Sequence, residues 1–322
     1  MDSSPRQRLY EPAAYFREDI IDVYGRFMAD LPQPIIDLFE YTYWVWYFTQ
    51  NEKYEEMMGF VEAVASPDLT MGKCVLVNAL YELESWCTSI IVQQTDGKII
   101  HARNLDFDNP DGMRKITFRA NFVRNGTNVY NAVMFAGNAG VYTGMKKGAF
   151  SISENQRFPQ KDEKGLVENI LMMFTGYKEI SWVVRETLNK CEDYDCAYEH
   201  LKNTEINALG YIILAGTKEN EGVVISRNRI GAAHEDHLNV TNGTWYVVQT
   251  NSDHWDQGCF NRCESAHTNL NKLGQDALDI TVLREKVLKV FPNQNYDTLY
   301  NTQFVPSDGL IDTISLKYAG DQ

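Results

Sequence analysis

The spacing of the apolar residues changes once along the chain, near residue 87, and this change constrains the fold more than any other feature. Residues 12–86 have the spacing of helices, as in "YFREDIIDVYGRFMADL" and "YEEMMGFVEAVA". From Thr88 onward the chain consists of short β-rich runs, separated by turn signals at Asp96-Gly97 and Asn125-Gly126. A helical segment therefore precedes a region of strands.

The order of the remaining segments indicates the fold class. A helical stretch over about residues 166–202 follows the first strands, then the strand-like runs "GYIILAGT", "EGVVISRN" and "TWYVVQTN", a final helix "DITVLREKVLKVF" and a hairpin-like tail. Runs of strands followed by runs of helices are typical of a layered α+β fold with a largely antiparallel sheet, rather than a doubly wound parallel one.

Composition limits the classes of partner. A chain of 322 residues, 44% apolar and 12% aromatic, can bury a full core as one large domain or two closely packed ones. The net charge of -14 argues against nucleic acid as a partner, because that interaction depends on clustered Lys and Arg. An acidic compartment would bring the chain closer to neutrality, which agrees with an enzyme of an acidic lumen.

One aromatic segment raises the question of membrane contact. No run approaches the roughly 20 apolar residues that span a bilayer. The nearest candidate, "IIDLFEYTYWVWYFTQ" at residues 35–50, contains two acidic residues and is predicted to be a buried amphipathic helix. The alternative interpretation is contact with a lipid surface through Trp44, Trp46 and Phe48.

Several features bear on the compartment and on metals. The start of the chain lacks an apolar h-region, so we expect that a signal peptide is absent or already removed from this numbering. Cys191 with Cys196, and Cys259 with Cys263, are close enough to pair in an oxidising compartment. The Cys259-x3-Cys263 spacing and "AHEDH" lack the geometry of common zinc motifs, so neither a metal nor a cofactor is predicted. The sequons that permit glycosylation are Asn125, Asn239 and Asn242.

Cys87 lies where the helical pattern gives way to strands, in "YELESWCTSIIVQQTDGKIIHARNLDFDN". If Asp96 and Gly97 form a two-residue hairpin turn, Asp106 lies directly across from Cys87. Strict alternation then sends Arg103 to the opposite face, so that Arg103 reaches Cys87 only through a bulge or a twisted strand end. There its guanidinium would lower the pKa of the thiol.

A nucleophilic cysteine also needs a base. His101 is one candidate, although the same hairpin sets it across from Val92, far along the strands from Cys87. Cleavage between Trp86 and Cys87 offers another, because it creates an α-amine on the nucleophilic residue itself. Such an amine has an ordinary pKa of about 7.7 to 8.0 and can take the thiol proton, with Asp106 holding it in place.

These motifs resemble a known family. "CTSIIVQQTDGKIIHARNLDFD", with "GVYTGMKKGAFSISENQR", "GVVISRNR" and "WYVVQTNSDHW", is similar to the acid ceramidase and N-acylethanolamine acid amidase family of lysosomal N-terminal nucleophile hydrolases. The resemblance covers nearly the whole chain. It implies a self-cleaved precursor with a four-layer αββα core, a helical α-subunit at residues 1–86 that stays attached, and a catalytic β-subunit at residues 87–322.

The resemblance also implies roles for individual residues. Cys87 matches the nucleophile, and the bond between Trp86 and Cys87 matches the cleavage site. Arg103 and Asp106 match the pair that orients and tunes the nucleophile. Asn251 matches the asparagine that stabilises the oxyanion, and an amide donor in that role is worth about 3 to 4 kcal/mol. Arg262 falls near the family's "DRR" segment, in "FNRCES", where it is a candidate for shaping the site.

The sequence departs from the family at one position. A glutamate that assists activation in the family is replaced by Gln156 in "SENQRF", so that a titratable carboxyl becomes a neutral amide. Gln156 can still shape the site by hydrogen bonding. Glu154 could take over the acidic role only if the strand register differed.

The resulting hypothesis is a self-cleaving lipid amidase that forms an α/β heterodimer from one precursor. It would hydrolyse the N-acyl bond of N-acylethanolamines or ceramides through a Cys87 thioester. The expected location is a lysosomal or other acidic lumen, or outside the cell after secretion. The expected partner surface is an anionic membrane or a lipid carrier. Two alternatives stay open: a catalytically silent lipid-binding relative, and a Cys/His protease that uses His101 or His254. Candidates for lining the acyl channel are Tyr142, Met145, His254 and Trp255.

Overall fold

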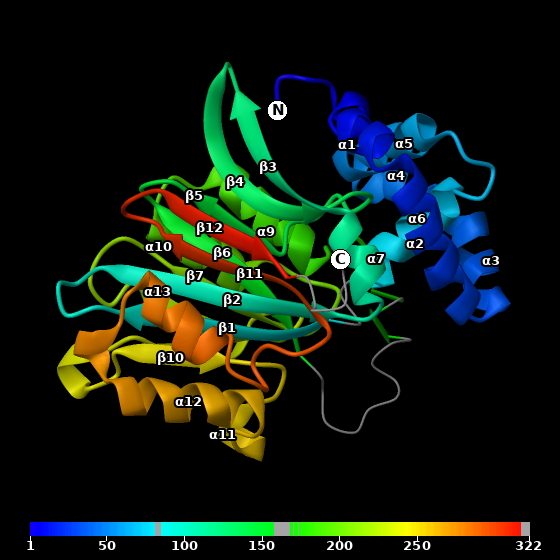
Figure 1. Cartoon of the computed structure of the whole chain (residues 1–322). Helices are drawn as coiled ribbons and strands as arrows, with labels where there is room; N and C mark the ends of the chain where they lie inside the picture. The colour runs from blue at the N-terminus through cyan, green and yellow to red at the C-terminus, as the bar shows by residue number, and fades with distance from the viewer. Residues whose placement is uncertain (81–84, 158–167, 170, 173, 317–322) are drawn as a thin grey trace.

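Two antiparallel sheets packed face to face form the centre of the molecule (Figure 1). The computed structural model describes residues 1–80, 85–157, 168–169, 171–172 and 174–316. Within these residues, one sheet has five strands in the order β10-β1-β2-β11-β12 and the other has seven, β3 to β9 in sequence order. The strands are β1 Ser85–Gln93, β2 Ile99–Phe107, β3 Thr117–Arg124, β4 Thr127–Phe135, β5 Thr143–Lys146, β6 Phe150–Gln156, β7 Gly210–Ala215, β8 Gly222–Arg227, β9 Ala232–His237, β10 Tyr246–Gln249, β11 Thr298–Val305 and β12 Leu310–Ser315.

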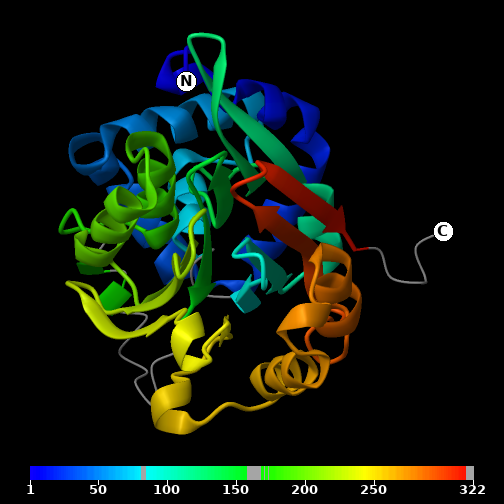
Figure 2. The same ribbon diagram turned by 90° about the vertical axis from the view of Figure 1, so that its left-hand side faces the viewer.

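Helices cover the outer faces of both sheets, and the helices of the N-terminal segment form a separate group at one end of the molecule (Figure 1). Figure 2 shows the N-terminal helices, in blue, well away from α12, in orange. The helices are α1 Tyr10–Tyr15, α2 Arg17–Asp30, α3 Gln33–Thr42, α4 Val45–Thr49, α5 Asn51–Val64, α6 Met71–Leu80, α7 Pro110–Lys115, α9 Ile180–Lys190, α10 Tyr194–Asn203, α11 His254–Gln257, α12 Arg262–Leu273 and α13 Ile280–Leu283, which continues as a π-helical turn over Arg284–Leu288.

Alternation of side chains along the strands builds the layers. Ile91 of β1 packs into the core between the sheets, with Tyr211 and Val224. Its neighbours Ile90 and Val92 point the other way, into the core beneath α12 and α13. Successive residues of a strand face opposite sides, and burying each such side chain stabilises the fold by about 1.5–3 kcal/mol. A third core joins the seven-stranded sheet to α9 and α10. The predicted α+β, four-layer αββα fold with an N-terminal helical segment is confirmed.

The N-terminal helices are joined to the rest of the chain by a large apolar core and by buried ion pairs. Phe107 of β2 and Phe135 of β4 belong to the same core cluster as residues of α2, α3, α5 and α6. Lys53 of α5 lies 2.7 Å from Glu179, and both side chains are buried. Arg185 of α9 donates to Glu56 of α5 at 2.6 Å. Removing one partner of such a buried pair is strongly destabilising, by about 3–5 kcal/mol.

The aromatic segment at residues 35–50 forms two helices, α3 and α4, instead of one. Trp46 is fully buried, as expected for a buried amphipathic helix, and the alternative of lipid contact is wrong for this residue, because this face of α4 packs against Phe39 and Phe174. Trp44 and Phe48 are 53% and 75% exposed. Within the described part of the chain, none of the helices combines the length and apolar character needed to cross a membrane.

Other sequence predictions are largely confirmed. The two short-range cysteine pairs are disulfides, Cys191–Cys196 and Cys259–Cys263. The strands predicted from β-rich runs are present, whereas β5, β9 and α12 were not predicted. The helical stretch predicted from about residue 166 begins partly outside the described residues, and its later part forms α9 and α10.

Candidate active site

The hairpin of β1 and β2 positions the candidate nucleophile, and its register differs from the predicted one by a single residue. Cys87 pairs with Leu105, and Trp86 pairs with Asp106. The loop has three residues instead of two: Gln94 donates its N–H to the carbonyl of Lys98, and Gly97 takes a positive φ of 86°. Such a three-residue loop with glycine in the left-handed region is a common hairpin connection.

A one-residue shift moves every side chain of one strand to the other face. Arg103 pairs with Ser89 and therefore shares the face of Cys87, so it reaches the thiol without the bulge or twisted strand end that was predicted. Arg103 Nη2 lies 2.8 Å from Cys87 Sγ. Asp106 lies on the opposite face, and the prediction that it is directly across from Cys87 is wrong.

The sulfur of Cys87 lies in a fully buried polar setting. Arg103 Nη1 donates to the carbonyl of Tyr142 and to Thr143 Oγ1, which fixes the guanidinium. Thr143 Oγ1 also lies 2.8 Å from the hydroxyl of Tyr300, and Glu154 is close enough to act electrostatically on both Cys87 and Arg103. Burial raises the pKa of the Cys87 thiol above its ordinary value, although Arg103 opposes this shift. In the uncut chain the expected lowering of that pKa by Arg103 is therefore outweighed.

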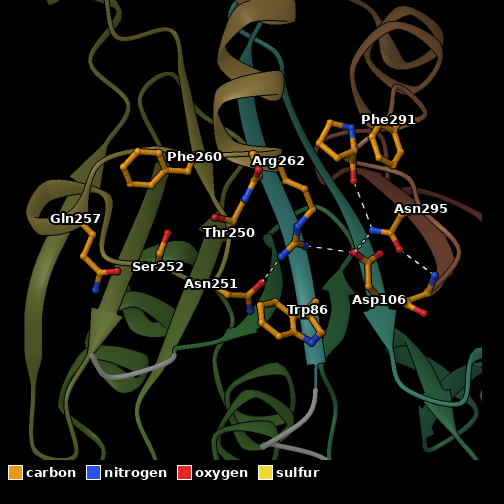
Figure 3. A pocket seen from close by; sticks show the side chains of 13 residues that line it. Trp86, Asp106, Thr250, Asn251, Ser252, Gln257, Phe260, Arg262, Phe291 and Asn295 are labelled. Carbon is orange, nitrogen blue, oxygen red and sulfur yellow. Dashed lines mark hydrogen bonds and ion pairs between the residues drawn. The ribbon is translucent and has the colours of Figure 1, made fainter. Parts of the chain in front are cut away.

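The backbone nitrogen of Cys87 has a separate set of partners from the sulfur. Cys87 donates its N–H to Asn251 Oδ1 at 2.8 Å. Arg262 Nη2 donates to the same oxygen at 2.8 Å, while Arg262 Nη1 lies 3.2 Å from Asp106 Oδ2 (Figure 3). Asp106 is thus connected to the nitrogen of Cys87 through Arg262 and Asn251. Burial raises the pKa of Asp106 to about 6, against the opposing effect of Arg262.

Two further residues hold the Asp106 carboxylate and were not found from the sequence. Thr298 donates its hydroxyl to Oδ1 at 2.7 Å, and Asn295 donates its amide to Oδ2 at 3.0 Å. Both come from the C-terminal part of the chain, where Thr298 begins β11 and Asn295 lies three residues before it, and no motif marks them. Arg262 was found through the family resemblance alone.

Gln156 ends β6 and contributes to the site through its backbone. Asn251 Nδ2 donates to the carbonyl of Gln156 at 2.8 Å. An amide nitrogen carries two N–H groups, so Asn251 has the chemistry to serve both this carbonyl and an oxyanion. Glu154, two residues earlier, supplies the buried carboxyl that acts on Cys87.

A pocket of about 600 Å³ opens beside Trp86 and Asp106, between the loop that follows β10 and the segment before β11 (Figure 3). Trp86 lies in this pocket and is half-exposed, whereas Cys87, the next residue, is fully buried. The residues that line the pocket are Trp86, Asp106, Thr250, Asn251, Ser252, Gln257, Phe260, Asn261, Arg262, Phe291, Pro292, Asn295 and Asp297.

The structure does not bring a histidine to Cys87. His101 is fully buried, with its ring nitrogens 2.9 Å from Ser151 Oγ and 2.8 Å from Ser153 Oγ, and burial lowers its pKa to about 3. It pairs with Ile91 and not with Val92. His254 lies beside Asp236, at 3.3 Å. Among the residues that the structure describes, the two histidines proposed as the base of a Cys/His protease therefore contact other groups than Cys87.

The residues predicted to line an acyl channel lie at different places. Tyr142 is buried beside Arg103, and Met145 is fully buried on β5. His254 and Trp255 belong to α11, where Trp255 stacks on His234 with ring centroids 4.3 Å apart. Their role toward an acyl chain stays a prediction. The three sequon asparagines, Asn125, Asn239 and Asn242, are exposed.

Two facing antiparallel sheets, each covered by helices, with a cysteine near the start of a central strand, define the fold of the N-terminal nucleophile hydrolases. A family model described as linear amide C-N hydrolases, choloylglycine hydrolase family, matches residues 87–279, so the match begins at Cys87. The chain belongs to this family.

Curated relatives share the same region. An N-acylethanolamine-hydrolyzing acid amidase of Caenorhabditis elegans is 38% identical over 271 residues, which cover 81% of this chain and 74% of the relative. The rat protein of that name is 39% identical over 73% of this chain, and the chain spans 64% of its length. Human acid ceramidase is 34% identical over 81% of this chain and 69% of its own length. A solved structure of the C. elegans amidase ortholog superposes with a TM-score of 0.67 at 35% identity, covering 72% of this chain and all of that one.

Proposed function

We propose that this chain is a self-cleaving lipid amidase that hydrolyses the N-acyl bond of N-acylethanolamines or ceramides to a fatty acid and an amine. The observation that best supports the proposal is that separate groups contact the sulfur and the backbone nitrogen of Cys87. Arg103 contacts its sulfur at 2.8 Å, and Asn251, held by Arg262, accepts its backbone N–H at 2.8 Å. A purely structural cysteine needs neither contact.

Self-cleavage would start at the bond between Trp86 and Cys87. Attack of Cys87 Sγ on the carbonyl carbon of Trp86 moves the acyl group from nitrogen to sulfur, and water then releases the new carboxyl end at Trp86. The nitrogen of Cys87 becomes a primary amine next to Asn251 Oδ1. The core and the buried pairs Lys53–Glu179 and Glu56–Arg185 would hold residues 1–86 to residues 87–322 as an α/β heterodimer.

Substrate hydrolysis would use the same atoms in two steps. The amine of Cys87 takes the thiol proton, and the thiolate attacks the carbonyl carbon of the lipid amide while Asn251 stabilises the oxyanion. The carbon–nitrogen bond breaks as the amine of Cys87 delivers its proton to the leaving nitrogen, leaving a thioester. Water activated by the same amine then releases the fatty acid and restores the thiol.

The pocket supports a substrate with polar and apolar parts. Asp106, Asn251 and Arg262 supply polar groups, and Phe260 and Phe291 supply exposed apolar surface. The relatives include amidases of N-acylethanolamines and an acid ceramidase, so both substrate classes belong in the first assay.

The compartment and the lipid surface are further parts of the proposal. Two disulfides and three exposed sequons support an oxidising, glycosylating route to an acidic lumen, whether lysosomal or secreted. Trp44 and Phe48 stand exposed on α4, and Tyr41 on α3 is 79% exposed. This aromatic surface is suited to contact with an anionic membrane or a lipid carrier.

The test is a product assay with a matched variant. Purified protein is incubated at pH 5 with a panel of N-acylethanolamines and ceramides, and the released fatty acids are measured by mass spectrometry. The proposal expects turnover of at least one class, and loss of that turnover in Cys87→Ala. A Cys74→Ala variant, which changes the other free cysteine, is the control.

The alternative is a lipid-binding relative without activity, and one feature favours it: residue 156, where the family resemblance implies a glutamate, is glutamine. If the chain is such an inactive relative, the wild type would bind the lipids of the panel without releasing fatty acid. Fatty acid release by the wild type that Cys87→Ala abolishes would exclude it.

A further inference from the structure

Two histidines and one aspartate from separate segments meet beside the loop that carries Asn251. His234 and Asp236 are two residues apart on β9, so their side chains share one face of the strand. That face is turned toward the other sheet, since Asp236 pairs with Val224, whose side chain lies in the core between the sheets. His254 begins α11, three residues after Asn251.

The three side chains have the spacing of metal ligands. Their donor atoms all lie within 4.8 Å of one another. His234 Nε2 is 3.2 Å from Asp236 Oδ1, and His254 Nε2 is 3.3 Å from Asp236 Oδ2. Ligands about 2.0–2.1 Å from a tetrahedral zinc ion are separated by about 3.3 Å, and each histidine nitrogen lies at about this distance from one of the two carboxylate oxygens. Both oxygens of Asp236 would therefore face the ion.

The two oxygens of the Asp236 carboxylate are contacted differently: Oδ1 lies in a hydrogen bond with His234 Nε2 at 3.2 Å, whereas Oδ2 has no well-aligned donor among the described residues. Its Oδ2 atom is shielded from solvent and accepts no hydrogen bond from the residues that the structure describes, although His254 Nε2 lies 3.3 Å away. A cation placed between the three donors would give this oxygen a direct partner in place of the poorly aligned imidazole contact.

We propose that His234, Asp236 and His254 form a binding site for one divalent transition-metal ion, with zinc as the ion that fits best. Two imidazoles and one carboxylate are a zinc donor set, whereas calcium and magnesium prefer oxygen ligands throughout. The three side chains are between about a quarter and a third exposed, so water can complete the coordination.

The ion would tie β9 to the loop that positions Asn251. This loop is already anchored one residue before His254, where Asp253 receives two hydrogen bonds from Arg157 and one from the hydroxyl of Tyr211. The metal would add a second anchor that depends on metal supply.

The sequence expectation of no metal site is revised by this proposal, because the third ligand lies 18 residues beyond Asp236 and no linear motif contains all three. A second group, Cys259, Cys263 and His267, is also close enough to hold an ion. Its two sulfurs form a disulfide, so it offers no thiolates unless reduced. It therefore serves as a control.

The test is calorimetric titration with zinc chloride of full-length Cys87→Ala protein, stripped with chelator, at pH 7.5 without reductant. We expect one zinc per chain. In His234→Asn and His254→Gln, the dissociation constant should rise by more than about 100-fold, beyond the 10- to 100-fold typical of outer-shell changes. His237→Gln and His267→Gln should bind as the parent does. The melting temperature of each metal-free variant reports whether it is folded.

Zinc should also raise the melting temperature of the parent and of His237→Gln at pH 7.5, but not that of His254→Gln. Absence of zinc binding by the folded parent would overturn the proposal. So would binding that survives in both His234→Asn and His254→Gln, or that is lost in His267→Gln alone. In each of these cases the two histidines would act as hydrogen-bond partners of Asp236 only.

Discussion

The buried carboxyl of Asp106 provides a quantitative test of the electrostatics around Cys87. Its pKa is raised from 3.8 to about 6, chiefly by burial. Because the folded chain holds the proton more tightly than the unfolded chain, protonation of Asp106 stabilises the fold. The contribution is fully present below about pH 4 and is lost as the pH rises through 6.

The size of this effect follows from the two pKa values. The contribution to the free energy of unfolding is about 1.4 kcal/mol at pH 5 and about 0.1 kcal/mol at pH 7. A chain with Asp106 should therefore gain about 1.3 kcal/mol on going from pH 7 to pH 5, in addition to the effects of all other groups. Asp106→Asn cannot titrate and should lack this increment.

The assay is urea unfolding at pH 5 and pH 7, with Cys87→Ala as the parent so that the chain stays uncut. Thr298, Asn295 and Arg262 donate hydrogen bonds to Asp106. Any weakening of these bonds in Asp106→Asn occurs at both pH values, so it cancels when the free energies of unfolding at pH 5 and pH 7 are subtracted. Exposed Asp276, changed to Asn, is the control and should keep the parent's difference. An Asp106→Asn variant with the same pH difference as the parent would refute the reasoning.

Three further predictions concern catalysis and lipid contact. Asn251→Leu should lower kcat of the cleaved enzyme by about 100- to 1,000-fold, measured by fatty acid release, because an oxyanion donor is lost; a change in KM alone would contradict this role. Gln156→Glu restores a titratable carboxyl and keeps the backbone carbonyl that accepts a hydrogen bond from Asn251. The pH profile of self-cleavage should therefore change shape, which denaturing gels of protein incubated from pH 4 to 7 would show. Joint replacement of Trp44 and Phe48 by serine should abolish stimulation by anionic vesicles and spare hydrolysis of a soluble substrate, and unchanged stimulation would remove the membrane proposal.

The layered fold could be predicted because it depends on local patterns. Alternating apolar residues mark most strands, and helical spacing marks residues 12–86, of which residues up to Leu80 form helices and Ser85 begins β1. Strand β9 was missed because it lies at a sheet edge and carries "AHEDH", whose polar residues hide the alternation. The aromatic segment at residues 35–50 gave no local sign that Trp46 packs inward while Trp44 does not.

The contacts of the active site could be predicted only in part, because the sequence does not determine the register of the hairpin or the distant partners of Asp106. "TDG" is compatible with a two-residue and a three-residue hairpin loop, and that single residue decides whether Arg103 or Asp106 shares the face of Cys87. The partners Asn295 and Thr298 come from about 190 residues later, and only folding brings them to Asp106.

The most direct test of the account is the N-terminal sequence of the chains present after incubation at mildly acid pH, read by Edman degradation and intact mass. Self-cleavage between Trp86 and Cys87 should give two chains, residues 1–86 and a second that begins Cys87-Thr88-Ser89, while a Cys87→Ala chain should stay whole. Hydrolysis of lipid amides by a wild-type chain that remains uncut, or a cut at any other bond in the active form, would contradict it.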